Sequence, residues 1–326
     1  MVLKDRIQLI IFLTMAVLIS DTMTSSAETW QLEQGQDWKS VQTKGEDKYL
    51  LVVAHTENLI NSGQTLELFE EWSELRKELP EIAEQDLDIF IEAELYFCDE
   101  KFTKATRNYN KFLDKDYRDN ILYDVVLERL FRIAKAFLAG RTKTVLGIFK
   151  IKGYAEGIRI MENITDRVSD RPIGIQAAVA VAKSYEQRKM FNEAHLKWSE
   201  ISWQWKTGQI AKQALLSMAQ CKHAAYKGPN YNASSLDSAK TYYENFKLRY
   251  SEDAKELGID EILKQIYEQT AYKQLCVGRY YQKTDNRLAA NLYYQMVIRN
   301  WPESKSAELA KEALTENLSG VKTKNE

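Results

Sequence analysis

The sequence predicts an all-α fold, a superhelical solenoid of about six helical hairpins. Two observations predict it. The chain of 326 residues contains only 13 Gly and 4 Pro, and the long segments between them are rich in Ala, Leu, Glu, Lys and Gln, which favour helices. In addition, an apolar pattern with the period of an α-helix recurs six times along the chain.

Residues 1–27 are predicted to form a secretory signal peptide. Lys4 and Arg6 precede an apolar run from Ile7 to Ile19, and small residues up to Ala27 follow it. The run of about 13 residues is too short to cross roughly 30 Å of hydrocarbon as a helix; an uncleaved membrane anchor is the alternative. The segment has no Cys to carry a lipid. We therefore expect an exported protein.

Residues 28–48 form a leader ahead of the first helical pattern. This leader contains Trp30 and Trp38. It is expected either to pack across the first hairpin or to serve as a flexible segment that a partner recognises. The solenoid is predicted over residues 49–318, and a disordered tail over residues 319–326.

The repeat consists of a small or apolar anchor residue followed by large apolar residues at fixed distances. Offsets of 0, 4, 7 and 11 place four side chains on one face of a helix. The small anchor is expected to let the second helix of each hairpin approach the first. The anchors are Leu68, Ala105, Gly157, Ala194, Ala239 and Ala290. The residues at +4 are Trp72, Tyr109, Met161, Trp198, Tyr243 and Tyr294; those at +7 are Leu75, Phe112, Ile164, Ile201, Phe246 and Val297. Five of the six residues at +11 are again large and apolar, namely Leu79, Val168, Trp205, Tyr250 and Trp301; the second repeat has Asp116 there, with Tyr117 one step on.

The spacing of the anchors identifies the type of repeat. Successive anchors are 37, 52, 37, 45 and 51 residues apart. Tetratricopeptide (TPR) repeats have a period of about 34 residues, so the spacings indicate TPR hairpins with insertions between them. Because a single hairpin cannot bury its apolar face, the hairpins are expected to stack into a right-handed superhelix with an extended concave surface.

The insertion at residues 141–153 is both basic and apolar. It has the sequence RTKTVLGIFKIKG. Such a composition is compatible with contact to anionic lipid or to a partner. The interpretation that we favour is a loop or short helix that folds onto its own hairpin.

Composition and motifs argue against catalysis. The 45 basic and 47 acidic residues leave no basic excess for nucleic acid. Three Cys and three His are scattered without metal-ligand spacing, and no nucleophile, phosphate-binding or dinucleotide motif occurs. His195 follows an anchor and is expected to face outward or along a groove edge. The sequence therefore predicts a protein that is not an enzyme and has no cofactor, metal or nucleic-acid site.

One tryptophan is a candidate contact for a protein partner. Trp198 and Trp205 occupy the +4 and +11 positions and are expected in the core. Trp203 lies off that stripe. It is either an exposed aromatic anchor for a partner, of the kind that dominates interface energetics, or an ordinary surface residue.

The C-terminal repeats resemble those of the BamD family of outer-membrane-assembly TPR proteins. The resemblance extends as repeat order from Asp86 to Leu314. It is carried by the residues LCVGRYYQK from Leu275 to Lys283, the pairs Ala289-Ala290 and Tyr293-Tyr294, the turn Trp301-Pro302 and the helix Ala307 to Leu314. The chain departs from the family in having no lipidation Cys, an extra segment before Asp86 and the insertion at 141–153.

The resemblance implies a periplasmic scaffold, peripheral to the outer membrane at most through a partner, whose partners are a component of the barrel-assembly machinery and unfolded outer-membrane proteins. The barrel-inserting partner would dock on the C-terminal repeats, and the clients on the N-terminal concave face. Arg279, Lys283 and Arg299 would then make salt-sensitive contacts with a partner; the alternative for each is a solvated surface charge. The alternative function is a periplasmic TPR adaptor that coordinates cell-envelope or cell-division complexes.

Overall fold

The computed structural model describes residues 29–31, 39–41, 84–115, 121–145 and 149–322. The predicted signal peptide and the first repeat, anchored on Leu68, lie outside these residues. The chain divides into two compact units: Met1–Leu32 with Trp38–Arg129, and Glu33–Asp37 with Leu130–Glu326. Each unit is described by itself below.

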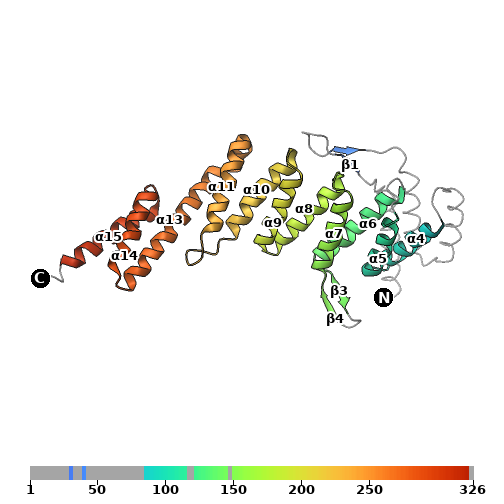
Figure 1. Ribbon diagram of the computed structural model, residues 1–326, viewed down its shortest axis with the longest axis horizontal. Coiled ribbons are helices and arrows are strands. Elements are labelled where there is room, and N and C mark those ends of the chain that lie inside the picture. Colours follow the sequence, from blue (N-terminus) through green and yellow to red (C-terminus); the bar gives the residue numbers. More distant parts are fainter. Residues whose placement is uncertain (1–28, 32–38, 42–83, 116–120, 146–148, 323–326) are drawn as a thin grey trace, which may run out of the picture. The chain divides into compact units, whose positions relative to one another are not determined.

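The first unit contains two short strands and the first described hairpin of helices (Figure 1). In the predicted leader, β1 (Thr29–Gln31) pairs antiparallel with β2 (Lys39–Val41). Helix α4 (Glu84–Cys98) packs against α5 (Phe102–Leu113), which carries the anchor Ala105. Helix α6 (Ile121–Leu138) begins in this unit and continues into the second.

The second unit is a succession of helices joined by short connections (Figure 1). Neighbouring helices pack against one another along the chain, and the described residues thus confirm an all-α array of TPR-like hairpins. The predicted tail boundary at 318 falls inside the last helix. The helices are α7 (Tyr154–Arg167), α8 (Pro172–Gln187), α9 (Phe191–Gln204), α10 (Gly208–Ala224), α11 (Ser234–Arg249), α12 (Ser251–Glu256), α13 (Ile259–Lys283), α14 (Arg287–Asn300) and α15 (Lys305–Lys322).

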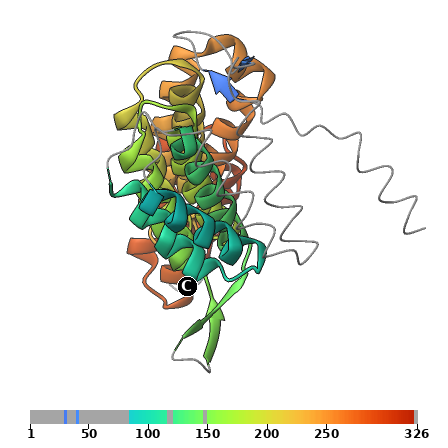
Figure 2. The same cartoon turned by 90° about the vertical axis from the view of Figure 1, so that its right-hand side faces the viewer.

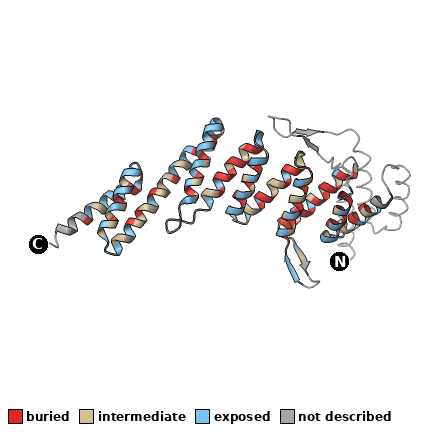
Figure 3. Ribbon diagram, viewed as in Figure 1, coloured by how far each residue is buried: buried red, intermediate tan, exposed pale blue. Residues whose placement is uncertain are grey.

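The insertion between α6 and α7 is a β-hairpin, contrary to the favoured interpretation. Strand β3 (Thr142–Val145) pairs antiparallel with β4 (Phe149–Lys152). Figure 2 shows this hairpin extending away from the helices of its unit. Thr, Val, Ile and Phe favour a pleated strand, and this local preference prevails over folding back. All four residues of β4 are exposed (Figure 3).

The anchors and the residues four and seven positions later form the core, as the repeat predicts. At all five described anchors, the residues at 0, +4 and +7 are buried. Gly157 shows why the anchor is small: a Cβ there would lie 2.9 Å from the carbonyl oxygen of Ala134 on α6. The second helix of the hairpin therefore approaches the backbone of the first.

The four +11 residues within the described part of the chain are not on the helix face but just beyond the helix end, which corrects the prediction. Val168, Trp205, Tyr250 and Trp301 are the C-cap residues of α7, α9, α11 and α14. Each backbone N–H donates to the carbonyl oxygen of the +7 residue, which satisfies one of the unpaired groups at a helix end. The apolar side chain at +11 therefore accompanies the turn that ends the helix.

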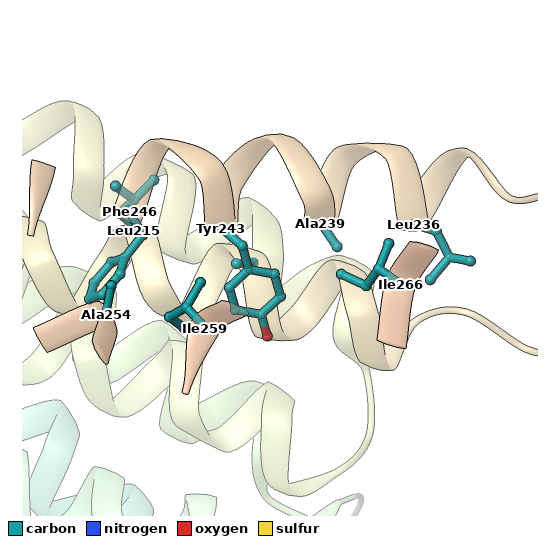
Figure 4. Packing of buried hydrophobic residues seen from close by; sticks show 9 residues of the cluster. Leu215, Leu236, Ala239, Tyr243, Phe246, Ala254, Ile259 and Ile266 are labelled. Carbon is teal, nitrogen blue, oxygen red and sulfur yellow. The ribbon is translucent and has the colours of Figure 1, made fainter. Parts of the chain in front are cut away.

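Packing joins each hairpin to the next. Figure 4 shows Leu236, Ala239, Tyr243 and Phe246 along one face of α11. They form one buried cluster with Leu215 of α10 and with Ala254, Ile259 and Ile266 of α12 and α13. Helix α11 thus packs between α10 of its own hairpin and the helices α12 and α13 that follow, as expected of a solenoid.

Candidate protein-binding surface

Trp203 is the most exposed aromatic residue of α9. Its side chain lies in the last turn of that helix and is 76% exposed. The ammonium group of Lys206 lies 6.0 Å from the centre of its ring. The structure thus places Trp203 on the surface, as the sequence suggested, beside a positive charge.

The three predicted basic residues are exposed but occupy two different helices. Arg279 and Lys283 lie four residues apart, on one face of α13. Arg299 lies in the last turn of α14. The structure therefore brings Arg279 and Lys283 together and leaves Arg299 on a separate helix.

Trp203 and Arg299 share a repeat position that the sequence analysis did not consider. Both stand nine residues after an anchor, as does Leu248 on α11. At 100° per residue, an offset of nine points away from the anchor, and so does an offset of two. Leu196 and Leu292 occupy the +2 position on α9 and α14.

These outward positions carry a set of exposed apolar side chains, which we name the outer row. Leu248 is 83% exposed, and the other members are also exposed. Leu288 and Met296 extend the row along α14 at helical spacing. The outer row comprises Leu196, Trp203, Leu248, Leu288, Leu292 and Met296. Reading the +2 and +9 offsets of the repeat would have found Leu196, Trp203, Leu248 and Leu292 from the sequence; Leu288 and Met296 lie four residues to either side of Leu292.

The exposed side of α13 that carries Arg279 also carries tyrosines. Tyr272 and Tyr280 are exposed. A hydrogen bond with Cys276 raises the pKa of Tyr272, and the positive charge of Arg279 acts in the opposite direction. This helix therefore offers phenol and guanidinium groups side by side, which suits contacts to polar or acidic segments.

A chain of neutral hydrogen bonds holds the last helices together beneath these surfaces. The hydroxyl of Tyr294 donates to Oε1 of Gln282 at 2.5 Å, and Nε2 of Gln282 donates to Oδ1 of Asn317 at 3.0 Å. Nδ2 of Asn317 donates to Oδ1 of Asn291. The carboxylate of Glu268 accepts backbone N–H bonds from the first turn of α15. These bonds fix α13, α14 and α15 relative to one another.

A buried ion pair does the same in the first unit. Glu94 on α4 accepts the hydroxyl of Tyr109 at 2.5 Å and the Nε of Arg129 at 3.2 Å. All three side chains are buried. The guanidinium of Arg129 also lies 4.9 Å from the ring centre of Phe97. Sequence analysis missed this group because its members are far apart in the chain.

His195 is buried, which corrects the expectation that it faces outward or along a groove edge. Its Nε2 lies 3.1 Å from the hydroxyl of Tyr242 on α11. Burial lowers the pKa of His195 to about 4, and the nearby charge of Lys222 adds to the effect. The imidazole is therefore neutral at neutral pH and acts as a packing group between two hairpins.

Among the described residues, no three His, Cys, Asp or Glu side chains are placed to hold a metal ion. Of the cysteines, Cys221 is buried, whereas Cys98 and Cys276 are half-buried. Within the same part of the chain, no helix is long and apolar enough to cross a membrane.

Comparisons with known proteins add the following. No family model matches the sequence, and the comparison with curated proteins finds no match. Among solved structures, PilW, titled a widely conserved type IV pilus biogenesis factor, is 16% identical, with 79% of this chain and 97% of that chain covered and a TM-score of 0.25. A human IFIT1 dimer with m7Gppp-AAAA is 12% identical, with 83% and 73% covered and a TM-score of 0.23. Likenesses of this size carry no inference about function, and the chain is classified by its own repeat geometry as an array of TPR-like hairpins.

Proposed function

We propose that this protein is a non-enzymatic scaffold that binds protein partners through the outer row and the exposed side of α13. The observation that carries the proposal is the outer row itself. Six large apolar side chains are exposed at outward positions of α9, α11 and α14, each of which is the second helix of its hairpin. Exposed apolar groups that recur at outward positions, where a solvated helix ordinarily carries polar residues, point to an interaction surface.

The composition of these surfaces suits a protein ligand. Trp, Met and Arg are enriched at protein interfaces, and Trp and Arg often carry most of the binding energy. The outer row has Trp203 at one end and Met296 with the neighbouring Arg299 at the other. A partner that covers it would bury apolar groups at the centre and leave charges at the rim.

The test is a binding comparison of two variants. Trp203→Ser combined with Leu248→Ser removes the two most exposed apolar groups of α9 and α11. The matched control, Lys240→Ser with Lys247→Ser, changes exposed residues of α11 outside the row. After crosslinking in an envelope extract, we expect the first variant to lose the partners that the wild type and the control retain. Equal recovery by all three proteins would refute the proposal.

In its finer form, the proposal is an envelope-assembly scaffold similar to BamD, located in the periplasm. The signal-like N-terminus and the resemblance of residues 275–314 support it. The partners would be a barrel-assembly component and outer-membrane clients. The alternative is a periplasmic adaptor with one dedicated folded partner in cell-envelope or cell-division complexes.

A titration separates these two forms. A scaffold for clients binds extended peptides from outer-membrane β-barrels, and it also docks a barrel-assembly component with an affinity that falls as salt rises because Arg279 and Lys283 contribute. Arg279→Glu with Lys283→Glu should weaken that docking without changing the thermal melt. A dedicated adaptor instead forms one stoichiometric complex and ignores the peptides.

A further inference from the structure

The β3–β4 hairpin is amphipathic from one face to the other. Directly paired residues of an antiparallel ribbon lie on the same face, and successive residues alternate. Phe149 and Ile151 therefore share one face with Lys143, whose ammonium is paired with Glu156, and Lys150 and Lys152 share the other. Phe149 is 59% exposed and Ile151 is 47% exposed. The ribbon thus presents apolar and cationic groups to solvent at the same time.

The charge of this segment departs from that of the chain. From Arg141 to Ala155 the sequence has four basic residues and no acidic residue, whereas the whole chain has a net charge of −2. The nearest acidic group at the base is Glu156, and its carboxylate is paired with both Lys143 and Arg159. Burial opposes ionisation of Glu156, but these two hydrogen bonds outweigh it and lower its pKa. The negative charge of Glu156 at the base of the hairpin is therefore already compensated by neighbouring cations.

The hairpin is fixed to its helices at the base. The N–H of Gly153 donates to the carbonyl oxygen of Arg141 at 2.9 Å, which closes the ribbon. A Cβ at Gly153 would lie 2.2 Å from Cδ1 of Phe137 on α6, so only glycine fits there. The ammonium of Lys152 donates to the carbonyl oxygen of Gly140. The exposed strand β4 is thus part of a projection that these contacts hold in place.

We propose that this hairpin binds the surface of an anionic lipid bilayer directly. Phe149 and Ile151 enter the boundary between headgroups and acyl chains, and the ammonium group of Lys150 reaches the anionic headgroups along its flexible stem. This contact goes beyond the proposed scaffold function, in which any membrane association runs through a protein partner.

The size of the hairpin favours lipid over an acidic protein as its ligand. Specific protein interfaces bury at least about 1,000 Å² with complementary shape. Two strands of four residues offer too little surface for that. A bilayer demands no shape complementarity, and two apolar side chains with a basic flank provide the two combined signals that peripheral binding needs.

Hydrogen exchange of the full chain with and without vesicles tests the proposal at the hairpin itself. Phosphatidylglycerol–phosphatidylcholine vesicles should slow amide exchange in the peptide covering 141–153, whereas pure phosphatidylcholine vesicles should not. Peptides from α14 should exchange at the same rate in both. Unchanged exchange at 141–153 with the anionic vesicles would overturn the proposal.

Flotation with the same vesicles then tests the side chains. Phe149→Ser with Ile151→Ser, and separately Lys150→Glu, should each lower partitioning to anionic vesicles by about tenfold or more. The matched controls are Leu248→Ser for the lost apolar group and Lys255→Glu for the charge, both at exposed sites on other helices. Partitioning of the hairpin variants equal to that of the controls would contradict the proposal.

The two proposals fail separately. Hairpin variants should lose lipid binding and keep the protein partners, whereas outer-row variants should do the reverse. A thermal melt monitored by circular dichroism checks that each variant is folded. The hairpin variants should melt like the wild type, because β4 makes no contribution to the buried core.

Discussion

The first and last described hairpins place a tyrosine at the same repeat position and satisfy its hydroxyl in opposite ways. Tyr109 on α5 donates to the carboxylate of Glu94, which is paired with Arg129 from the next helix. Tyr294 on α14 donates to the amide of Gln282, which bonds onward to Asn317 from the next helix. In both, the following helix supplies the group that completes the network. The repeat thus fixes the position of the tyrosine hydroxyl, whereas the group that accepts its hydrogen bond, a carboxylate or an amide, differs between the hairpins.

The outward positions of the same helices differ as well. At +2 and +9, α5 carries Arg107 and Asp114, whereas α14 carries Leu292 and Arg299. Charged outward residues are ordinary for a solvated helix. An apolar residue exposed at the same position stabilises nothing in the fold. The comparison separates a hairpin built around a buried ion pair from one that offers a surface for binding.

The largest effect is expected when the buried ion pair is broken. Arg129→Leu leaves the carboxylate of Glu94 buried without its charge partner, and we expect a loss of about 3–5 kcal/mol in the free energy of unfolding. Urea unfolding measures it, and hydrogen exchange in α4 and α5 locates it. The matched control Arg107→Leu, at an exposed site on α5, should change stability by less than about 0.5 kcal/mol. Equal effects of the two variants would show that the ion pair is not what holds this hairpin.

A smaller effect is expected when each tyrosine loses its hydroxyl. Tyr109→Phe removes a hydrogen bond to a buried carboxylate and should cost about 2–3 kcal/mol. Tyr294→Phe removes a bond to a neutral amide and should cost about 1 kcal/mol. Both values come from urea unfolding of the single variants. The contrast between the hairpins is lost if the order is reversed.

How far these features follow from the sequence depends on the range of the interactions. The positions 0, +4 and +7 recur within each second helix of a hairpin. The core residues at these positions, from Ala105 to Val297, could therefore be predicted from spacing alone. The +11 position could not be placed correctly, because a helix end depends on the turn that follows. The ion pair joins residues 35 positions apart and leaves no local pattern. Most of the outer row could have been predicted, since it uses the same repeat register. Predicting the β3–β4 hairpin required weighing the strand preference of its residues against the helical segments around it.

The next effect is a pH dependence that differs between the two hairpins. Burial, with the charge of Glu94, raises the pKa of Tyr109 well above its ordinary value; burial also raises the pKa of Tyr294. The folded chain keeps these protons when the unfolded chain loses them, so stability falls as pH rises above about 10. We expect hydrogen exchange between pH 9 and 11, corrected for its intrinsic rate, to show α5 losing protection. Tyr109→Phe should reduce that loss, and an unaltered profile would contradict the assignment.

The smallest effect on stability, and the most informative for function, is expected from exchanging outward residues between hairpins. Leu196→Arg with Trp203→Asp gives α9 the pair found on α7, Arg159 and Asp166. Because these positions face solvent, the free energy of unfolding should change by less than about 0.5 kcal/mol.

Partner binding should nevertheless be lost, because the apolar groups that a partner would bury are replaced by charges. The conservative control, Leu196→Met with Trp203→Phe, keeps the apolar character and should retain binding. A pull-down with the two variants side by side decides the matter. If the charged variant still binds, the apolar outward residues are not the contact surface, and the difference between the hairpins then concerns only how each core is stabilised.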